Sequence, residues 1–496
     1  MRGIPLPLEL ARAQERIERI ASEFELTFFP VVFEVVDYEQ MNALAAYAGF
    51  PTRYPHYRFG MEYLQLSKSY EYGLHKIYEM VINNDPTYAY LLEGNAMLDQ
   101  KLVMAHVYGH ADFFRNNMYF AHTNRRMVDA MANHATRVRR YQERYGIEAV
   151  EKLIDACLSI EDLIDPSAVF LPAAPRSEIV PPEPEPDEAP GRLPAKAYLD
   201  RYVNPPDYLE EQRKLVEEQR ERSRRFPAKP ERDVLGFLLN HAPLSNWERD
   251  VVGIIREEGY YFLPQRQTKV MNEGWASYWH SKIMTTRVLN DAEIIDYADH
   301  HSGTVATQPG RLNPYKLGIE LFRDIERRWD CGRFGPEWEA CESMAARANW
   351  DRQLGLGRAK IFEVRRVHCD STFLDAYLTP EFCEEQRLFV SSEDAKTKKP
   401  AVSTRSFDDV KQALLFQMTN GGRPAIELVD ANYANRSELL LRHRHAGVDL
   451  RMDWARDVLQ GLTLLWRRPV RLETVREGKP VRLGHDGTAA SEESIE

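Results

Sequence analysis

The spacing of apolar residues predicts that most of the chain is helical. Residues 6–24 have the pattern of an amphipathic helix, in which the apolar positions are Leu10, Ile17, Ile20 and Phe24. Helical patterning runs through residues 68–145 and returns over 231–390. Within the second stretch, Asn313-Pro314 has the composition of a helix start, with a capping residue followed by a first-turn proline.

From about residue 400 the pattern becomes mixed. Residues 406–417 and 450–465 keep helical spacing. Two pairs of strand-like runs, each separated by turn-forming residues, predict two hairpins, at 424–445 and at 467–486. This end of the chain therefore reads as a small α/β domain.

These patterns predict a mainly α fold with a large helical body and a small C-terminal α/β domain. Nine prolines fall between residues 165 and 194, together with clustered acidic residues, so this stretch is expected to be an extended, solvated linker or insertion. The two parts of the body are predicted at 1–164 and 206–395, on either side of the linker at 165–205. The α/β domain is predicted at 396–484 and a disordered tail at 485–496.

Composition narrows the class of protein. The 496 residues carry a formal net charge of -11, which argues against a duplex nucleic-acid binder. No run of about 18 apolar residues predicts a membrane span, and the N-terminus lacks the apolar core of a signal peptide. The five cysteines form no CxxC motif. We therefore expect reduced thiols and a cytoplasmic protein.

Residues 105–117 are the first segment that could carry chemistry. His106 and His110 are four residues apart, so on a helix they lie on one face and can offer two imidazoles to a single metal ion. Their neighbours are apolar and aromatic, which predicts burial. Buried imidazoles need partners, although a chance HxxxH pair in a polar core remains the alternative interpretation.

Residues 263–284 are the second such segment. Glu273 and His280 are seven residues apart, two helical turns, within a run of tyrosines and tryptophans. A carboxylate in such surroundings is either exposed, capping a helix start, or held by a cation. If this helix meets the first one, His106, His110 and Glu273 form a two-histidine, one-carboxylate metal site, with His280 or His301 as a further ligand or as a partner of a ligand.

The same segments resemble the stage V sporulation protein R (SpoVR) family. The resemblance is carried by long blocks in the family's order, at residues 55–95, 100–117, 262–280 and 312–318. It implies a bacterial cytoplasmic protein with a role in sporulation, specifically in forming the spore cortex, which is peptidoglycan. Relatives also occur in bacteria that do not form endospores.

A second resemblance concerns zinc peptidases. Residues 272–278 (NEGWASY) look like the helix that supplies their glutamate ligand, and residues 106–110 (HVYGH) resemble their HExxH helix. Val107 stands where the general-base glutamate belongs, so another carboxylate must serve if the site is hydrolytic. The candidates are Glu62, Glu93 and Asp112.

The leading hypothesis is a metal-dependent hydrolase, with zinc as the first candidate metal, acting in cell-envelope or spore-cortex assembly. The main alternative is a non-catalytic regulator or scaffold in which the same residues form a structural polar core. A non-haem iron oxidoreductase is a third reading of the same ligands. The C-terminal domain is expected to recruit a protein partner.

Overall fold

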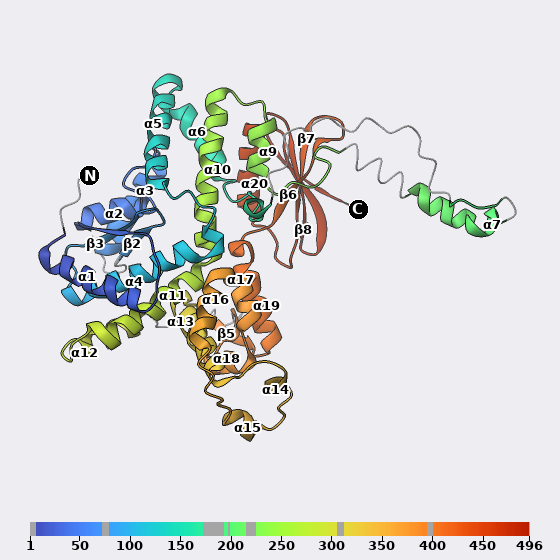
Figure 1. The fold of residues 1–496 in the computed structure, drawn as a ribbon. Coiled ribbons are helices and arrows are strands. Elements are labelled where there is room, and N and C mark those ends of the chain that lie inside the picture. The colour runs from blue at the N-terminus through green and yellow to red at the C-terminus, as the bar shows by residue number, and fades with distance from the viewer. Residues whose placement is uncertain are drawn as a thin grey trace. The chain divides into compact units, whose positions relative to one another are not determined.

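The computed structural model describes residues 6–71, 79–171, 193–196, 199–214, 225–304, 312–393 and 400–495. Most of the expected acidic linker, 165–205, lies outside these ranges. The described chain is mainly helical, as predicted, and forms two compact units (Figure 1). Unit 1 comprises Met1–Arg144 and Tyr260–Gly422, and unit 2 comprises Tyr145–Gly259 and Arg423–Glu496. The predicted boundaries at 164/165, 205/206 and 395/396 stay predictions.

Unit 1 contains most of the helices. The amphipathic helix predicted at residues 6–24 is confirmed as α1, and the Asn313-Pro314 start is confirmed because the Asn313 side chain accepts from two backbone N–H groups at the start of α13. The helices of this unit are α1 (Leu8–Glu23), α2 (Tyr38–Ala46), α3 (Tyr57–Glu71), α4 (Met97–Asn116), α5 (Met127–Tyr145), α11 (Lys269–Ile283), α12 (Ile294–Thr304), α13 (Pro314–Cys331), α14 (Pro336–Glu339), α15 (Met344–Ala348), α16 (Gly357–Val367), α17 (Asp370–Tyr377), α18 (Pro380–Glu385) and α19 (Phe407–Met418).

A three-stranded sheet lies beside these helices, and two of its strands fall within 68–145, where the sequence predicted only helix. The strands are β1 (Val31–Val36), β2 (Glu79–Ile82) and β3 (Thr87–Leu92), in the order β1-β3-β2. β3 pairs parallel with β1 and antiparallel with β2. The prediction was wrong here because short apolar runs fit a strand as well as a buried helix turn. A separate antiparallel pair is formed by β4 (Val390–Glu393) and β5 (Pro400–Thr404).

Helices α4, α11 and α13 form the centre of unit 1 and approach one another at small residues. A Cβ on Gly109 of α4 would lie 2.6 Å from the Cα of Ala276 in α11, and a Cβ on Gly274 of α11 would overlap the backbone of Gly318 in α13. Large aromatic side chains fill the space around these crossings, among them the fully buried Trp275, Trp279, Tyr108 and Phe322. Close backbone approach and dense packing fix the three helices relative to one another.

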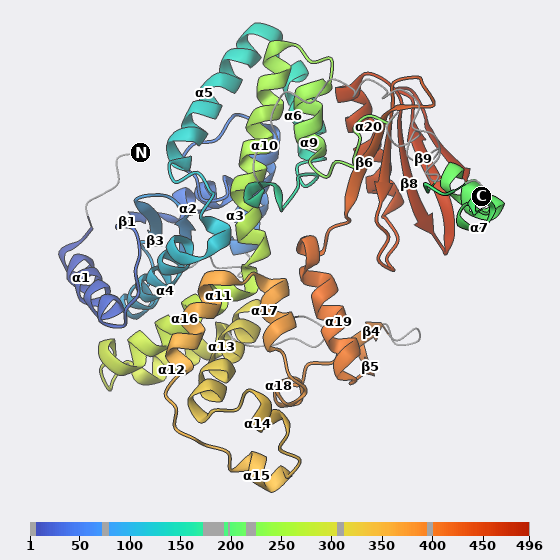
Figure 2. The same cartoon turned by 45° about the vertical axis from the view of Figure 1, so that its right-hand side comes forward.

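Unit 2 contains the C-terminal α/β fold that the sequence predicted. Both hairpins are confirmed, as β6 (Ile426–Tyr433) with β7 (Glu438–His443) and β8 (Val470–Arg476) with β9 (Lys479–His485). β7 and β8 pair in parallel, and the connecting helix α20 (Met452–Trp466) contacts β8 and β9 (Figure 2). Other helices of this unit include α6 (Ile147–Leu158), α7 (Asp200–Val203) and α9 (Val234–His241), and α10 (Asn246–Gln267) runs from unit 2 into unit 1.

The tail differs from the expected disorder over 485–496. Residues Ala490–Ser494 form β10, which pairs antiparallel with β9 and completes a sheet of order β10-β9-β8-β7-β6. Glu492 pairs with Arg476, and Glu493 with Arg471 and Arg482. Arg482 lies directly opposite Glu493 on the neighbouring strand β9, whereas Arg471 and Arg476 reach β10 from β8. These opposite charges favour pairing and explain why a polar segment joins the sheet.

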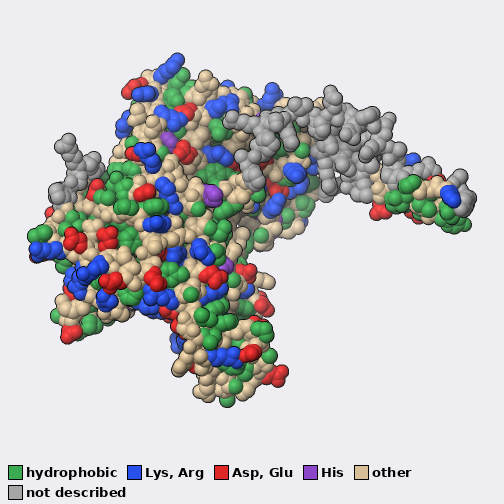
Figure 3. All heavy atoms as spheres, in the orientation of Figure 1, with side chains coloured by type: hydrophobic (Ala, Val, Ile, Leu, Met, Phe, Trp, Pro, Cys, Tyr) green, Lys and Arg blue, Asp and Glu red, His purple; other side chains and the backbone are tan. Residues whose placement is uncertain are grey.

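Two surface properties bear on the class of protein. No helix of the described residues is long and apolar enough to span a membrane. Figure 3 shows basic and acidic side chains interspersed over the visible face rather than gathered by sign. Mixed charge of this kind is typical of an ordinary solvated surface.

Candidate metal centre

Helix α4 supplies two imidazoles. His106 and His110 lie one turn apart, and their rings approach edge to face with centroids 4.6 Å apart. Both side chains are buried, each about 4% exposed. Most apolar residues of α4 are buried as well, so the two histidines belong to a core helix, which also buries the polar residues Asp99, Gln100 and Asp112.

Helix α11 supplies Glu273. The side chain is 10% exposed, and its Oε1 accepts a 2.9 Å hydrogen bond from Nζ of Lys269, one turn earlier. The start of α11 is held by Asp370, which accepts from the backbone N–H groups of Val270 and Met271 at 2.8 Å each. A carboxylate at a helix N-terminus satisfies donors that have no partner within the helix, so α11 is anchored where it carries Glu273.

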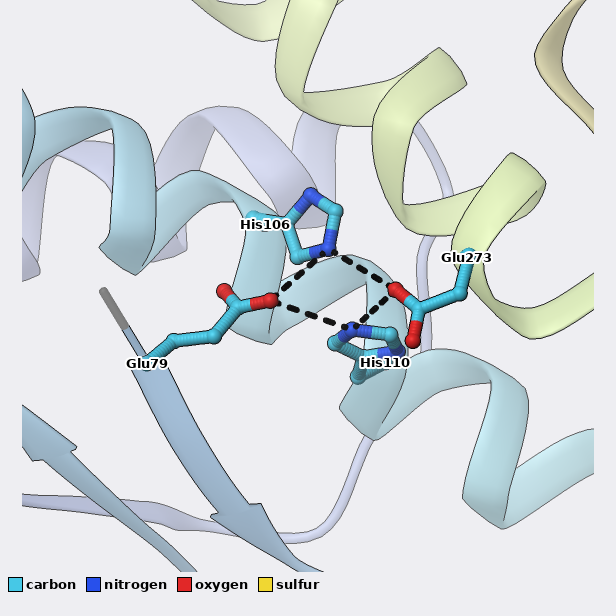
Figure 4. Close-up of side chains that lie close together, drawn as sticks. All are labelled: Glu79, His106, His110 and Glu273. Atoms are coloured by element: carbon cyan, nitrogen blue, oxygen red, sulfur yellow. Dashed lines mark ion pairs between the residues drawn. The ribbon is translucent and has the colours of Figure 1, made fainter. Parts of the chain in front are cut away.

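Strand β2 supplies a fourth group that the sequence analysis missed. Glu79 is the first residue of β2, and alternate side chains of a strand point to the same side. Val81, two residues on, packs against the main core, whereas Met80 packs against a second apolar cluster. Glu79 therefore points with Val81 toward α4, between His106 and His110 (Figure 4).

The four side chains converge on one point. Nε2 of His106 lies 3.2 Å from Oε1 of Glu79 and 3.6 Å from Oε2 of Glu273. Nε2 of His110 lies 3.8 Å and 3.5 Å from the same two oxygens. All four ligand-type atoms lie within 4.8 Å of one another. The expected meeting of His106, His110 and Glu273 is thus found in the structure, with Glu79 added.

These separations have the size of a metal coordination shell. Donors bound tetrahedrally at about 2.0–2.2 Å stand roughly 3.3–3.6 Å apart. A direct N–H···O bond would instead bring nitrogen and oxygen to about 2.9 Å. Nε2 of His106 and Oε2 of Glu273 are buried without a hydrogen-bond partner, which is costly in the absence of a cation. The residues therefore fit a divalent ion.

The Nδ1 atoms of the two histidines, which do not face the carboxylates, also have partners. Nδ1 of His110 lies 2.9 Å from Oδ1 of Asn272, so it donates its proton there and leaves Nε2 with a free lone pair. Nδ1 of His106 lies 2.7 Å from Nδ1 of His280. Partners of this kind fix the orientation and the tautomer of metal-binding imidazoles.

Charge within the group shifts its titration strongly. Burial alone would raise the pKa of Glu273, but His106, His110 and Lys269 lower it to about 2. Burial alone would also raise the pKa of Glu79, and the two histidines hold it far below its usual range. For His106, burial lowers the pKa, but Glu79 and Glu273 raise it to about 9. The two carboxylates thus share the positive charges of His106 and Lys269, and a metal ion would supply further positive charge where the carboxylates converge.

The other predicted residues lie outside this group of four. His280 is buried behind His106, and its Nε2 is 3.4 Å from Nδ1 of the half-buried His301. Burial and the neighbouring histidines lower the pKa of His280 well below its usual value, so it is neutral. His280 therefore contacts Nδ1 of His106, which is the role of a ligand's partner that the sequence analysis allowed. His301 in turn contacts His280.

The carboxylates proposed as a general base lie elsewhere. Asp112 is fully buried and accepts from Nε1 of Trp275 and from the backbone N–H of Thr27, both at 2.8 Å. Glu62 and Glu93 are exposed and are not part of the buried group. Glu79 escaped prediction because it begins a strand that was expected to be helix. An acidic residue directly before the apolar run Met80–Ile82 is the only local sign.

Comparison with known proteins defines the class. The model of the family described as SpoVR like protein matches residues 7–423, and the model of the SpoVR-like C-terminal domain matches residues 424–477. The chain therefore belongs to the SpoVR family. It is similar to the uncharacterized protein YcgB of Escherichia coli (strain K12), with 28% identity over 503 residues that cover 94% of this chain and 92% of that protein. No solved structure matches.

Proposed function

We propose that the protein is a metal-dependent hydrolase of cell-envelope or spore-cortex assembly. Glu79, His106, His110 and Glu273 hold one divalent ion, with zinc as the first candidate. The observation that carries the proposal is the set of nitrogen–oxygen separations of 3.2–3.8 Å between buried groups. Imidazole and carboxylate donors suit zinc, and also iron and manganese, so elemental analysis of the purified protein identifies the ion.

The ion would supply Lewis acidity and lower the pKa of water, the usual basis of metal-assisted hydrolysis. The protein's own contribution is position. Helix α4 sets the spacing of the imidazoles, Lys269 orients Glu273, and Asn272 and His280 orient the histidine rings. The assignment to the envelope or cortex rests on family membership.

A non-catalytic regulator or scaffold is the second candidate. One observation favours it: four protein donors suffice for a closed tetrahedral shell, the arrangement typical of structural zinc sites. In that case the ion would stabilise unit 1 and react with nothing.

The variants His110→Ala and Glu273→Ala test the proposal, with the exposed His122→Ala as the matched control. We expect both site variants to lose the bound ion and to fail to complement a sporulation or envelope phenotype, while staying folded, because the remaining donors can take water. The control should keep the ion and complement. Thermal melts with and without chelator accompany the assay.

The opposite pattern would defeat the enzymatic proposal. If the residues form only a polar core, each alanine leaves buried partners unsatisfied at a cost of about 1–3 kcal/mol, and a chelator does not change the melting of the wild type. Destabilised, metal-independent variants that a stabilising second-site change restores to function would exclude catalysis.

A further inference from the structure

The two carboxylates of the buried group are held very differently. Glu273 lies on a central helix that α4 and α13 pack against, and Lys269 binds the oxygen that does not face the histidines. Glu79 begins β2, a strand that pairs only with β3 among the described residues. Its side chain is 22% exposed, compared with 10% for Glu273. The ion pairs of Glu79 in the described chain are those with His106 and His110.

The two carboxylates also approach from opposite sides. Figure 4 shows Glu79 on the strand side of the two histidines and Glu273 on the helix side. The histidine rings are backed by Asn272 and His280, so neither ring can leave without breaking a buried hydrogen bond. The strand side, where Glu79 stands, is the more exposed side of the group.

We propose that Glu273 is the permanent carboxylate ligand of the site and that Glu79 is an exchangeable one. In the resting state both bind the ion. An oxygen-donor ligand, either water or a carbonyl or hydroxamate oxygen, replaces the Glu79 oxygen. The freed carboxylate then accepts a hydrogen bond from the water, or from an N–H or O–H group next to the incoming oxygen. The exchange breaks one oxygen–metal bond and forms another, with no change in oxidation state.

This inference rests on the proposed metal site and deepens it in one respect. A closed four-donor shell offers no place for a substrate, whereas one displaceable donor opens a place without disturbing the other three. Glu79 would then occupy the role that the glutamate of an HExxH helix would have had at position 107, where this chain has valine. Glu79 is thereby assigned as the group that receives the substrate's or water's hydrogen bond.

The test compares Glu79→Gln with Glu273→Gln in the full chain, since each amide has nearly the shape of the acid it replaces. Zn²⁺ affinity is measured by competition with a chelating dye. Loss of a residue that only hydrogen-bonds a metal ligand typically lowers metal affinity by about 10–100-fold, so loss of a permanent ligand should lower it further. We expect Glu273→Gln to weaken Zn²⁺ binding by about 100-fold or more and Glu79→Gln by about 10-fold or less.

A second measurement uses Co²⁺ as a visible substitute ion and acetohydroxamate as the oxygen-donor probe. In the wild type the probe must displace Glu79, so Glu79→Gln should bind it several-fold more tightly and show the changed Co²⁺ spectrum at lower concentration. Lys269→Gln serves as a further variant that leaves both carboxylates in place. In this background the two glutamine changes should cost more nearly equal amounts of Zn²⁺ affinity, because Lys269 no longer holds Glu273 in place.

The outcomes separate this inference from the proposed function. Equal losses of Zn²⁺ affinity in the two glutamine variants, or a probe affinity that Glu79→Gln leaves unchanged, overturn the exchange and leave the metal site standing. A wild-type protein that binds neither Zn²⁺ nor Co²⁺ overturns both. Circular dichroism of each variant confirms that a lost ion does not reflect lost folding.

Discussion

His106 carries the proton that a metal ion must displace. Glu79 and Glu273 stabilise its imidazolium, and Nε2, which faces both carboxylates, is the nitrogen that would bind a cation. Metal binding to such a residue is coupled to release of that proton. The charge of the empty site is thus set by the same atoms that would bind the ion.

This coupling predicts a pH dependence. The pKa of His106 is raised to about 9, so below that pH the empty site is protonated and Zn²⁺ affinity should rise about tenfold per pH unit. The rise should be present between pH 6 and pH 8 and should level off near pH 9. Dye competition in that range measures it, and calorimetry in buffers of different ionisation enthalpy counts the released protons. A flat affinity profile without proton release would contradict the assignment of His106 as a ligand.

At the scale of elements, the site depends on how closely α11 approaches its neighbours. Gly274 follows Glu273 directly and packs against Gly318 of α13, with no room for a side chain between the backbones. On the other side, Gly109 lies between His106 and His110 in the chain and faces Ala276. The residues that permit the helix crossings are therefore neighbours of the residues that form the site.

A methyl group at the crossing of α11 and α13 should lower stability and weaken metal binding together. We expect Gly274→Ala and Gly318→Ala to lower the free energy of unfolding by about 1–3 kcal/mol, the usual cost of overpacking, and to weaken Zn²⁺ binding because α11 must shift. Thermal melts and dye competition measure the two effects.

Gly60→Ala and Gly303→Ala are the matched controls, since both glycines are helical and have nothing within 4 Å of the added methyl. These changes should be neutral or stabilising by up to about 1 kcal/mol, because alanine favours a helix more than glycine does. If Gly274→Ala behaved like these controls, the crossing would not be what positions Glu273.

At the scale of the whole molecule, the chain passes between its two compact units more than once. Residues Tyr145–Gly259 belong with Arg423–Glu496, and α19 belongs with unit 1. Val410 and Leu414 of α19 are buried in the main core of unit 1. In unit 2, Gly461 of α20 packs closely against Ala156 and Ser159 at the end of α6.

This arrangement predicts different results for two truncations. A chain that ends at Gly422 keeps α19, so unit 1 should retain its melting transition and its metal site, while the rest of unit 2 loses α20 and its sheet. A chain that ends at residue 395 also loses Val410 and Leu414, each worth roughly 1.5–3 kcal/mol when buried. Unit 1 should then melt at a lower temperature. Calorimetry measures the melting temperature of each truncated chain, and the visible spectrum of bound Co²⁺ reports whether the metal site is kept. If both chains melt at the same temperature, the boundary at 395 is favoured.

The sequence alone determined those features that depend on residues near one another in the chain. Helical spacing identified α1, α19 and α20, and turn residues between strand-like runs identified both C-terminal hairpins. The same local geometry placed His106 with His110, because the face of a helix is set by 3.6 residues per turn.

Only the tertiary structure decided which distant residues meet. Glu79 belongs to a four-residue strand, and a short apolar run does not distinguish strand from buried helix by its period. Its direction became defined only when β2 paired with β3 and turned Glu79 toward α4. The approach of α11 to α4 likewise depends on contacts between glycines and alanines far apart in the chain. No period along the sequence records such contacts, so the buried group of two imidazoles and two carboxylates is a product of packing.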